Sequence, residues 1–380
     1  MNRFDIVQNR DGTGSSKWSR YPADVLPMWV ADMDFPVAPE ILAALGKRLE
    51  HPVLGYGVAR DELREQIVAD MAKHYGWAIK QDDIVFLPGV EPGFNMALKA
   101  MFASDDSVLV QTPVYRPILN APGHWGLVRQ EAPLIPSASG WVMDRETFSD
   151  RLAFSKALLF CNPHNPTGKV FTRDELVWIA EQCHRHDAII ISDEIHCELL
   201  LDGRNHVPIA TLSPDAEQRT ITLMAASKTY NIAGLKTAFA IIQNPKIRER
   251  FAASRLGMVD SVNILGLEAT LAAFRGAEAW KTELLAYLQS NRDFLMKEIA
   301  RRFPTIRCLA PEGTFLAWLD CSKLGLTPDP QSFFLDRGKV AFSAGSEFGT
   351  DYKDFVRLNF GCPRSLLEEG LQRMQTALLD

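Results

Sequence analysis

The sequence predicts an α/β protein with a large domain, whose mainly parallel sheet is flanked by helices, and a smaller α+β domain. Three observations predict this class. Short apolar runs bounded by turn residues recur from the first quarter to past the middle of the chain. Helical patterns lie between several of these runs, and such alternation favours a parallel sheet covered on both faces. Beyond about residue 255, longer helical patterns and shorter extended segments replace the alternation.

Each predicted strand of the large domain is a short, apolar run, as expected when both faces of a sheet are buried. The runs span residues 84–87, 107–111, 157–161, 188–192, 220–224 and 238–242. Between them, apolar residues recur with the helical period over 91–102 and 173–186, so helices are predicted there.

The last third of the chain predicts the smaller domain. Helices are expected over 261–274, 278–303 and 365–378, and extended segments over 306–309, 314–319, 340–342 and 355–358. The long helix at 278–303 is expected to join the two domains. The first 35 residues are too polar to form a core alone and should pack across the junction. The expected division is therefore a segment over 1–45 that joins the small domain, a large domain over 46–275 and a small domain over 276–380.

Composition excludes several classes of protein. Of 380 residues, 47% are hydrophobic and 23% charged, which is typical of globular proteins. A net charge of -6 disfavours nucleic acid as a partner. No run approaches the roughly 20 apolar residues of a membrane span, and the N-terminus lacks a signal-peptide pattern, so a cytoplasmic protein without a membrane partner is expected. The cysteines form no Cys-x-x-Cys pair, so no metal site is predicted.

Candidate functional residues follow the predicted strands, because ligands of open α/β sheets bind beyond the carboxyl ends of the strands. The turn at 162–168, dense in proline and asparagine, presents Asn165, although a tight connection alone also explains it. Asp193 ends a buried strand, with His196 three residues later. A buried carboxylate needs a cationic or hydrogen-bonding partner, so Asp193 should face one unless it is a structural cap.

Two further segments carry candidate functional groups. Lys228 follows an apolar strand among small residues, and a desolvated amine with a lowered pKa suits Schiff-base chemistry, although a surface lysine is the alternative. The glycine-rich turn at 86–93 leads into a helix, where backbone N–H groups and the helix dipole suit a phosphate. Such turns also serve packing alone.

Together and in this order, these segments resemble the aminotransferase class I/II family of fold type I pyridoxal-phosphate enzymes. The resemblance covers nearly the whole chain. It consists of the phosphate turn, the Asn-Pro-Thr-Gly loop, Asp193, Ser227 with Lys228, and Arg357. The chain is most similar to the branch of cystathionine β-lyases and cysteine-conjugate C–S lyases, through residues 26–35, 55–57, 112–115, 192–196 and 227–235. The resemblance implies a seven-stranded large sheet, pyridoxal 5′-phosphate as cofactor, an amino-acid substrate and a homodimer with shared active sites.

The resemblance also implies roles for the residues around the cofactor ring. Lys228 would hold the cofactor as a Schiff base and act as general base. Asp193 would pair with the pyridinium nitrogen, and Asn165 would hydrogen-bond the ring oxygen O3′. His196 would lie on the same side of the ring. Tyr115 would stack on the ring, with core packing as the alternative.

The remaining implied roles concern the phosphate and the substrate. Arg357 would bind the substrate α-carboxylate as a bidentate pair, and Asp32 is also expected in the substrate site. Lys236 stands where many family members have an arginine that binds phosphate, so its phosphate role is left open. The phosphate would be held by backbone amides of Gly89, Val90 and Glu91, by Ser227, and by Tyr56 of the partner subunit, which joins Lys228 in the catalytic set.

The expected function is therefore β-elimination from cystathionine or a cysteine S-conjugate, giving a thiol, pyruvate and ammonia. Two alternatives stay open. An aminotransferase would return the proton to the cofactor instead of expelling a leaving group from Cβ. A cofactor-bound regulatory or interaction protein would retain the site without catalysis.

Overall fold

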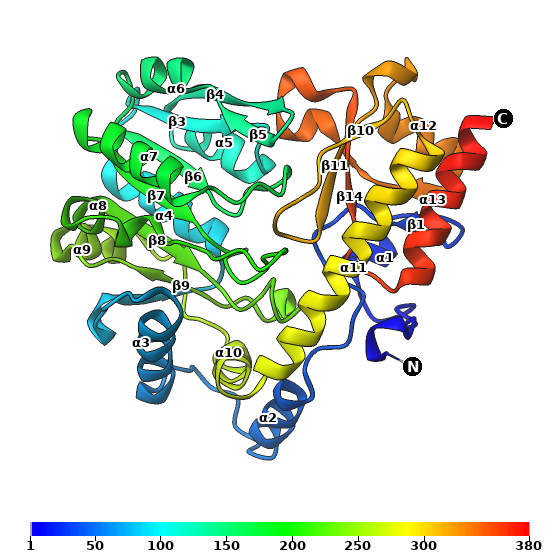
Figure 1. Ribbon diagram of the computed structural model, residues 1–380. Helices are drawn as coiled ribbons and strands as arrows, with labels where there is room; N and C mark the ends of the chain where they lie inside the picture. Colours follow the sequence, from blue (N-terminus) through cyan, green and yellow to red (C-terminus); the bar gives the residue numbers. More distant parts are fainter. Residues whose placement is uncertain (1, 380) are drawn as a thin grey trace.

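A large mixed sheet forms the centre of the computed structural model, which describes residues 2–379 (Figure 1). Over these residues the sheet has eight strands in the order β2-β9-β8-β7-β6-β3-β4-β5. Their bounds are β2 (Ile84–Leu87), β3 (Ser107–Thr112), β4 (Val128–Ser137), β5 (Gly140–Met143), β6 (Ala157–Cys161), β7 (Ile189–Asp193), β8 (Thr220–Met224) and β9 (Ala238–Ile241). Strands β4, β3, β6, β7 and β8 pair in parallel, whereas β9 pairs antiparallel with β2 and β8. The predicted α/β class with a mainly parallel sheet is confirmed.

Two strands depart from the sequence prediction. None of the six apolar runs covered β4 or β5, and the expected count of seven strands is one too low, because β5 pairs antiparallel with β4 as an eighth. Strand β4 contains Pro133 and Pro136 and several exposed residues, and both features argue against a strand in a sequence. Strand β4 lies near the edge of the sheet and forms a hairpin with β5. This position tolerates both the prolines and the exposed residues.

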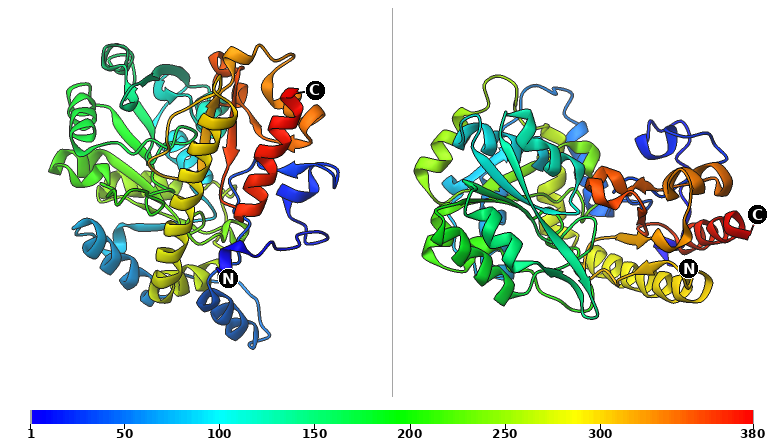
Figure 2. Two further views of the ribbon diagram at one scale, coloured as in Figure 1. Left: turned by 45° about the vertical axis from the view of Figure 1, so that its right-hand side comes forward. Right: turned by 90° about the horizontal axis from the view of Figure 1, so that it is seen from above.

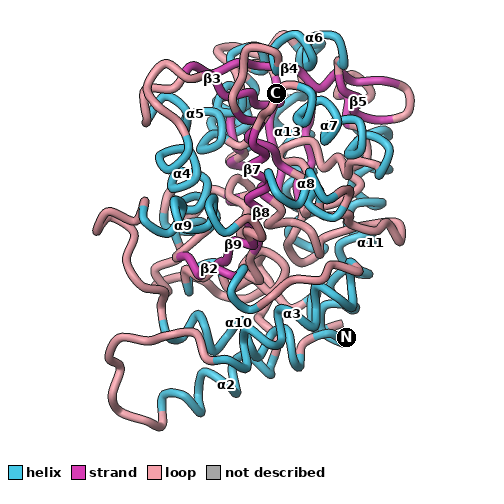
Figure 3. The backbone as a smooth tube through the Cα atoms, turned by 90° about the vertical axis from the view of Figure 1, so that its left-hand side faces the viewer, coloured by secondary structure: helices cyan, strands magenta, loops and turns pink. Residues whose placement is uncertain are grey.

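Helices cover both faces of the large sheet. One apolar cluster joins the sheet to α4 (Val90–Met101), α5 (Arg116–His124) and α9 (Pro245–Ala253), and another joins it to α6 (Arg145–Leu152), α7 (Arg173–Arg185) and α8 (Pro214–Arg219). Leu158 and Leu159 of β6 belong to different clusters, because side chains of adjacent strand residues point to opposite faces. Figure 3 shows α3 (Asp61–Tyr75) and α10 (Ile264–Gly276) next to α2 (Pro39–Leu49), with a long loop between α2 and α3.

A smaller antiparallel sheet lies beside the large one. Within the described part of the chain, it has four strands in the order β10-β11-β14-β13. These are β10 (Arg307–Cys308), β11 (Leu316–Asp320), β13 (Ser343–Ala344) and β14 (Phe355–Asn359). Its helices are α11 (Glu278–Arg302), α12 (Pro330–Gly338) and α13 (Arg364–Leu379). The long α11 runs along the junction between the two sheets (Figure 2).

The N-terminal residues pack on this smaller unit. After the short α1 (Ser16–Ser19), strand β1 (Leu26–Pro27) pairs in parallel with β12 (Val340–Ala341), the segment predicted as extended over 340–342. Phe4 and Met33 are fully buried in the same apolar cluster as Leu284 of α11 and Leu316 of β11. The domain boundaries at residues 45 and 275 stay a prediction. No helix over residues 2–379 combines the length and apolar composition needed to cross a membrane.

Candidate active site

A cavity of about 360 Å³ brings together most of the residues predicted from the sequence. Strands β6, β7 and β8 lie side by side and in parallel, so the segments that follow them reach the same edge of the sheet. The predicted residues in its wall are Gly89, Val90, Glu91, Tyr115, Asn165, Asp193, His196, Ser227, Lys228, Lys236 and Arg357.

Lys228 follows β8 and extends its amine into the cavity wall. Its Nζ donates a hydrogen bond of 2.7 Å to the backbone carbonyl of Ala31. Desolvation, helped by the charge of Arg357, lowers the pKa of Lys228 to about 8, although Asp32 and Asp193 oppose this shift. A substantial fraction of this amine is therefore neutral near physiological pH, as a nucleophile or general base requires.

Asp193 ends β7 as a buried carboxylate. Its Oδ1 accepts a hydrogen bond of 3.1 Å from the backbone N–H of Ile195. Burial raises the pKa of Asp193 to about 7, although the nearby charge of Lys228 opposes this. Among residues 2–379, no side chain forms an ion pair with Asp193 within 4.0 Å. The carboxylate is therefore available to a cationic group of a ligand.

Arg357 projects from β14 and is also buried. Its Nη1 donates to Asn165 Oδ1 at 2.9 Å, and its Nη2 donates to the Trp29 carbonyl at 2.9 Å and to Ser343 Oγ at 3.1 Å. The guanidinium lies 4.9 Å from the ring centre of Phe348. Burial lowers the pKa of Arg357 to about 10, so the side chain still carries its charge at neutral pH without a carboxylate partner. A substrate carboxylate would supply that partner.

Two aromatic residues complete the wall around these charges. Burial lowers the pKa of His196 to about 3, so its imidazole is neutral, and its Nδ1 is buried without a hydrogen-bond partner in the described structure. Tyr115 precedes the first turn of α5, and desolvation raises its pKa to about 12, which keeps the hydroxyl protonated.

The other end of the cavity is formed by the start of α4. Gly89 is the residue before this helix, and no side chain caps the helix N-terminus. The first backbone N–H groups of the helix are therefore open to an anion. The Glu91 side chain is exposed, which leaves its backbone as the contributing part. Lys236 adopts the left-handed backbone conformation at φ 49° and borders the same cavity.

Two predicted residues lie outside this wall. Asp32 is not among the residues that line the cavity, and its carboxylate forms an ion pair of 3.0 Å with Arg10; its role in the substrate site stays a prediction. Tyr56 is 97% exposed and lies in the loop between α2 and α3. It lines a neighbouring hollow together with Pro88 and Lys236, which also border the cavity.

The sequence-based prediction missed the backbone of Trp29 and Ala31. The Trp29 carbonyl accepts a hydrogen bond from Arg357 and the Ala31 carbonyl accepts one from Lys228, although each donor is distant in sequence from its acceptor. Residues 26–35 resemble the lyase branch in sequence, but no pattern of residue types shows which backbone carbonyl will accept a hydrogen bond. Phe348, which lies under the Arg357 guanidinium, was missed as well.

An α/β sheet of this topology, with Asp193 and Lys228 following adjacent strands, defines the chain as a fold type I pyridoxal-phosphate enzyme. The chain belongs to the aminotransferase class I and II family, whose profile matches residues 23–374.

Several relatives of the chain are lyases. It is 35% identical over 385 residues to cystathionine β-lyase PatB of Bacillus subtilis (strain 168), with 99% of each sequence covered. Its fold matches cystalysin of Treponema denticola, which contains pyridoxal 5′-phosphate, with a TM-score of 0.96 and 31% identity over 100% of this chain and 99% of the other. It also matches the crystal structure of OvoB, with a TM-score of 0.95 and 43% identity over 100% and 99% of the two chains.

Pyridoxal 5′-phosphate is the cofactor of this protein, as its bound form in similar structures supports. The residues of the cavity fit it. Asp193 lacks a cationic partner that a ring nitrogen would provide, and His196 Nδ1 lacks a hydrogen-bond partner. The uncapped start of α4 suits the phosphate, and the Lys228 amine suits the aldehyde.

Proposed function

We propose that this protein is a C–S β-lyase that cleaves cystathionine or another cysteine S-conjugate to a thiol, pyruvate and ammonia. One observation favours a lyase over an aminotransferase within the family. Arg357 is the only arginine among the described residues that line the cavity. The part of the site that one chain builds therefore offers one guanidinium fork, for the α-carboxylate, and no second one for the side chain of a dicarboxylic amino acid. The similarity to cystathionine β-lyase PatB supports the same conclusion.

The side chains of the cavity have separate tasks in this reaction. Pyridoxal phosphate, when bound, supplies an electron sink for the negative charge that develops at the substrate Cα. Arg357 binds and orients the α-carboxylate, while Asp193 holds the ring nitrogen in its protonated form. Lys228 Nζ removes the proton from Cα, a task that suits an amine whose pKa is lowered to about 8. His196 remains neutral and adds no positive charge beside the amine.

The overall reaction consumes one water. The C–H bond at Cα and the Cβ–S bond break, the sulfur leaves as a thiol with a proton, and the remaining three-carbon product takes up water to become pyruvate and ammonia. No external oxidant or reductant is needed. Transamination competes for the same negative charge at Cα, and a stable thiolate leaving group favours elimination.

The decisive experiment compares elimination with transamination directly. Purified protein is incubated with L-cystathionine while pyruvate and thiol are measured, and in parallel with L-alanine and a 2-oxo acid. We expect pyruvate and thiol in equal amounts from cystathionine, slow transamination of alanine, and neither product with Lys228→Ala. Background pyruvate from cystathionine beside rapid turnover of an amino acid with a 2-oxo acid would establish the aminotransferase alternative. Cofactor binding without either reaction would favour the regulatory alternative.

We also propose that the protein works as a homodimer whose partner subunit completes each site. The loop between α2 and α3 exposes a run of apolar side chains that includes Val53, Leu54, Tyr56 and Val58. Exposed apolar side chains that gather in one segment are typical of an interaction surface. The hollow beside Tyr56 shares Pro88 and Lys236 with the cavity, so a second subunit bound there would reach the phosphate end.

A further inference from the structure

The backbone of residues 29–33, called the carbonyl segment below, contacts both principal cations of the site. It leaves β1 as irregular chain. The Ala31 carbonyl accepts from Lys228 Nζ at 2.7 Å, and the Trp29 carbonyl accepts from Arg357 Nη2 at 2.9 Å. The positions of the proposed base and the proposed carboxylate clamp therefore depend on how firmly this piece of backbone is held.

Two asparagine side chains, Asn359 and Asn231, hydrogen-bond the carbonyl segment from the side that faces the two sheets. Asn359 Nδ2 donates to the carbonyls of Val30 and Asp32 at 2.7 and 2.8 Å. Asn231 donates to the Met33 carbonyl at 3.0 Å and accepts from its N–H at 3.2 Å. The segment thus has no regular secondary structure and relies on side chains for most of its hydrogen bonds.

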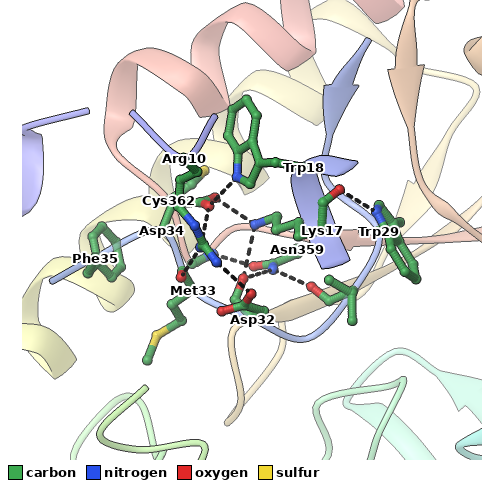
Figure 4. Close-up of polar contacts among 12 residues, drawn as sticks. Arg10, Lys17, Trp18, Trp29, Asp32, Met33, Asp34, Phe35, Asn359 and Cys362 are labelled. Carbon is green, nitrogen blue, oxygen red and sulfur yellow. Dashed lines mark hydrogen bonds and ion pairs between the residues drawn. The ribbon is translucent and has the colours of Figure 1, made fainter. Parts of the chain in front are cut away.

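A buried ion cluster holds the same segment from the N-terminal side (Figure 4). The Asp34 carboxylate, 4% exposed, accepts from Lys17 Nζ at 2.6 Å, from Arg10 Nη1 at 3.2 Å and from Trp18 Nε1 at 2.9 Å. Lys17 is only 1% exposed and donates a second bond of 2.9 Å to the Asp32 carbonyl.

Arg10 connects the cluster to the segment twice more. Its Nη1 donates to the Met33 carbonyl at 3.2 Å, and its Nη2 pairs with the Asp32 carboxylate at 3.0 Å. Each cation of the cluster therefore joins Asp34 to the backbone or side chain of the carbonyl segment.

Stability alone does not explain such a cluster. A buried ion pair must overcome a large desolvation penalty, and apolar residues of similar size often give equal or greater stability. A charged pair differs from apolar packing in its directionality, because each donor fixes the oxygen that it contacts. Here the fixed oxygens belong to the segment that contacts Lys228 and Arg357.

We propose that Arg10, Lys17 and Asp34 are positioning residues, which fix the carbonyl segment so that its Ala31 and Trp29 carbonyls orient Lys228 and Arg357. This inference deepens the proposed function and rests on the roles that it gives to those two residues. None of the three positioning residues lines the cavity. They act through the backbone of residues 29–33 and through the Asp32 carboxylate.

The test replaces the buried pair by apolar side chains in the double variant Lys17→Met/Asp34→Leu, which avoids leaving one buried charge alone. The matched control is Arg302→Met/Glu298→Leu on α11. Its ion pair of 2.6 Å has side chains only 6% and 8% exposed, and neither residue lines the cavity. Asp34→Asn serves as a second variant, which keeps the side-chain size but removes the carboxylate charge that the buried Lys17 ammonium faces. Thermal unfolding midpoints show how far each variant has lost stability.

Two measurements report on positioning. The first is the KM for L-cystathionine, which should rise about tenfold when Arg357 loses a fixed orientation, because one charge-assisted hydrogen bond changes binding by at least that factor. The second is the pH dependence of pyridoxal 5′-phosphate capture by the full-length apoprotein, which requires the neutral Lys228 amine. A hydrogen bond to the Ala31 carbonyl favours the ammonium form, so its loss should move the midpoint of capture down by about one pH unit.

The proposal requires both shifts in Lys17→Met/Asp34→Leu and in Asp34→Asn, and none in the control at comparable unfolding midpoints. Lower unfolding midpoints with an unchanged KM and an unchanged capture midpoint would show that the cluster is merely structural and would overturn the proposal. If the wild-type protein releases no pyruvate from cystathionine, the lyase proposal fails, whereas the capture midpoint still decides the positioning proposal.

Discussion

Burial disfavours the charged forms of Lys228, Arg357 and Asp193 in the cavity. Desolvation lowers the pKa of Lys228 to about 8 and that of Arg357 to about 10, and it raises the pKa of Asp193 to about 7. A ligand that carries a cationic ring nitrogen and a carboxylate would relieve two of these penalties at once. The site is therefore arranged for a ligand with charges at both places.

The first prediction is that Lys228 carries the cofactor, since its amine combines a lowered pKa with a place in the cavity wall. Borohydride reduction followed by peptide mapping should place the pyridoxyl group on Lys228. Lys236 borders the same cavity and serves as the internal comparison. A label found on Lys236 would contradict the assignment.

Arg357→Ala should weaken substrate binding, because it removes the guanidinium that we assign to the α-carboxylate. We expect the KM for cystathionine to rise by about 10- to 150-fold, which corresponds to roughly 1.5 to 3 kcal/mol. Asp193→Asn should instead lower kcat while changing KM little, since the ring nitrogen loses its counter-ion. Arg357→Lys keeps the charge near Asn165 and controls for structural damage. An unchanged KM in Arg357→Ala would count against the carboxylate clamp.

Asp193 should make the stability of the apoprotein depend on pH. Its pKa is about 7 in the folded cavity and about 3.8 in an unfolded chain, so the folded state holds the extra proton between these values. The free energy of unfolding should therefore fall as pH rises towards 7, by roughly 2 to 3 kcal/mol between pH 5 and 7.5 relative to Asp193→Asn. Urea unfolding of both apoproteins measures this difference. Parallel pH profiles for the two proteins would show that Asp193 does not titrate in this range.

Helix α10 packs closely against residues 235–237. This packing fixes the position of Lys236. A methyl group added at Gly266 would lie 1.8 Å from Thr237 Oγ1 and 2.4 Å from the Leu235 carbonyl, so either α10 or residues 235–237 must move. Gly266→Ala should therefore lower both the unfolding midpoint and the affinity for pyridoxal 5′-phosphate, measured by fluorescence titration. Gly234→Ala is the matched control, because an added methyl group there meets nothing within 4 Å. Wild-type cofactor affinity in Gly266→Ala would show that this contact does not place Lys236.

At the scale of the whole molecule, the dimer proposal gives Tyr56 a place in the partner's site. Mixing Tyr56→Phe with Lys228→Ala chains should restore lyase activity in part, because each mixed dimer contains one site with both residues intact. Subunit exchange is verified by tagging one chain, and each parent alone is the control. Activity no higher than that of the parents, despite proven exchange, would mean that each site is built within one chain.

Most strands of the large sheet, and the residues that follow them, are recognisable from the sequence alone, although the order of the strands is not. Asp193 and Lys228 are recognisable because each follows a short apolar run, and parallel strands bring such segments to one edge of a sheet. The same reasoning failed for β4, since Pro133 and Pro136 interrupt its apolar character.

The tertiary structure alone decided which groups meet across long stretches of the chain. Asp32 pairs with Arg10 rather than lining the cavity, and the Ala31 carbonyl accepts from Lys228 across 197 positions. Every residue has a carbonyl, so no pattern of residue types marks the one that becomes an acceptor. That choice depends on the packing of the N-terminal residues against the smaller sheet, which is set by contacts between parts of the chain that are distant in sequence.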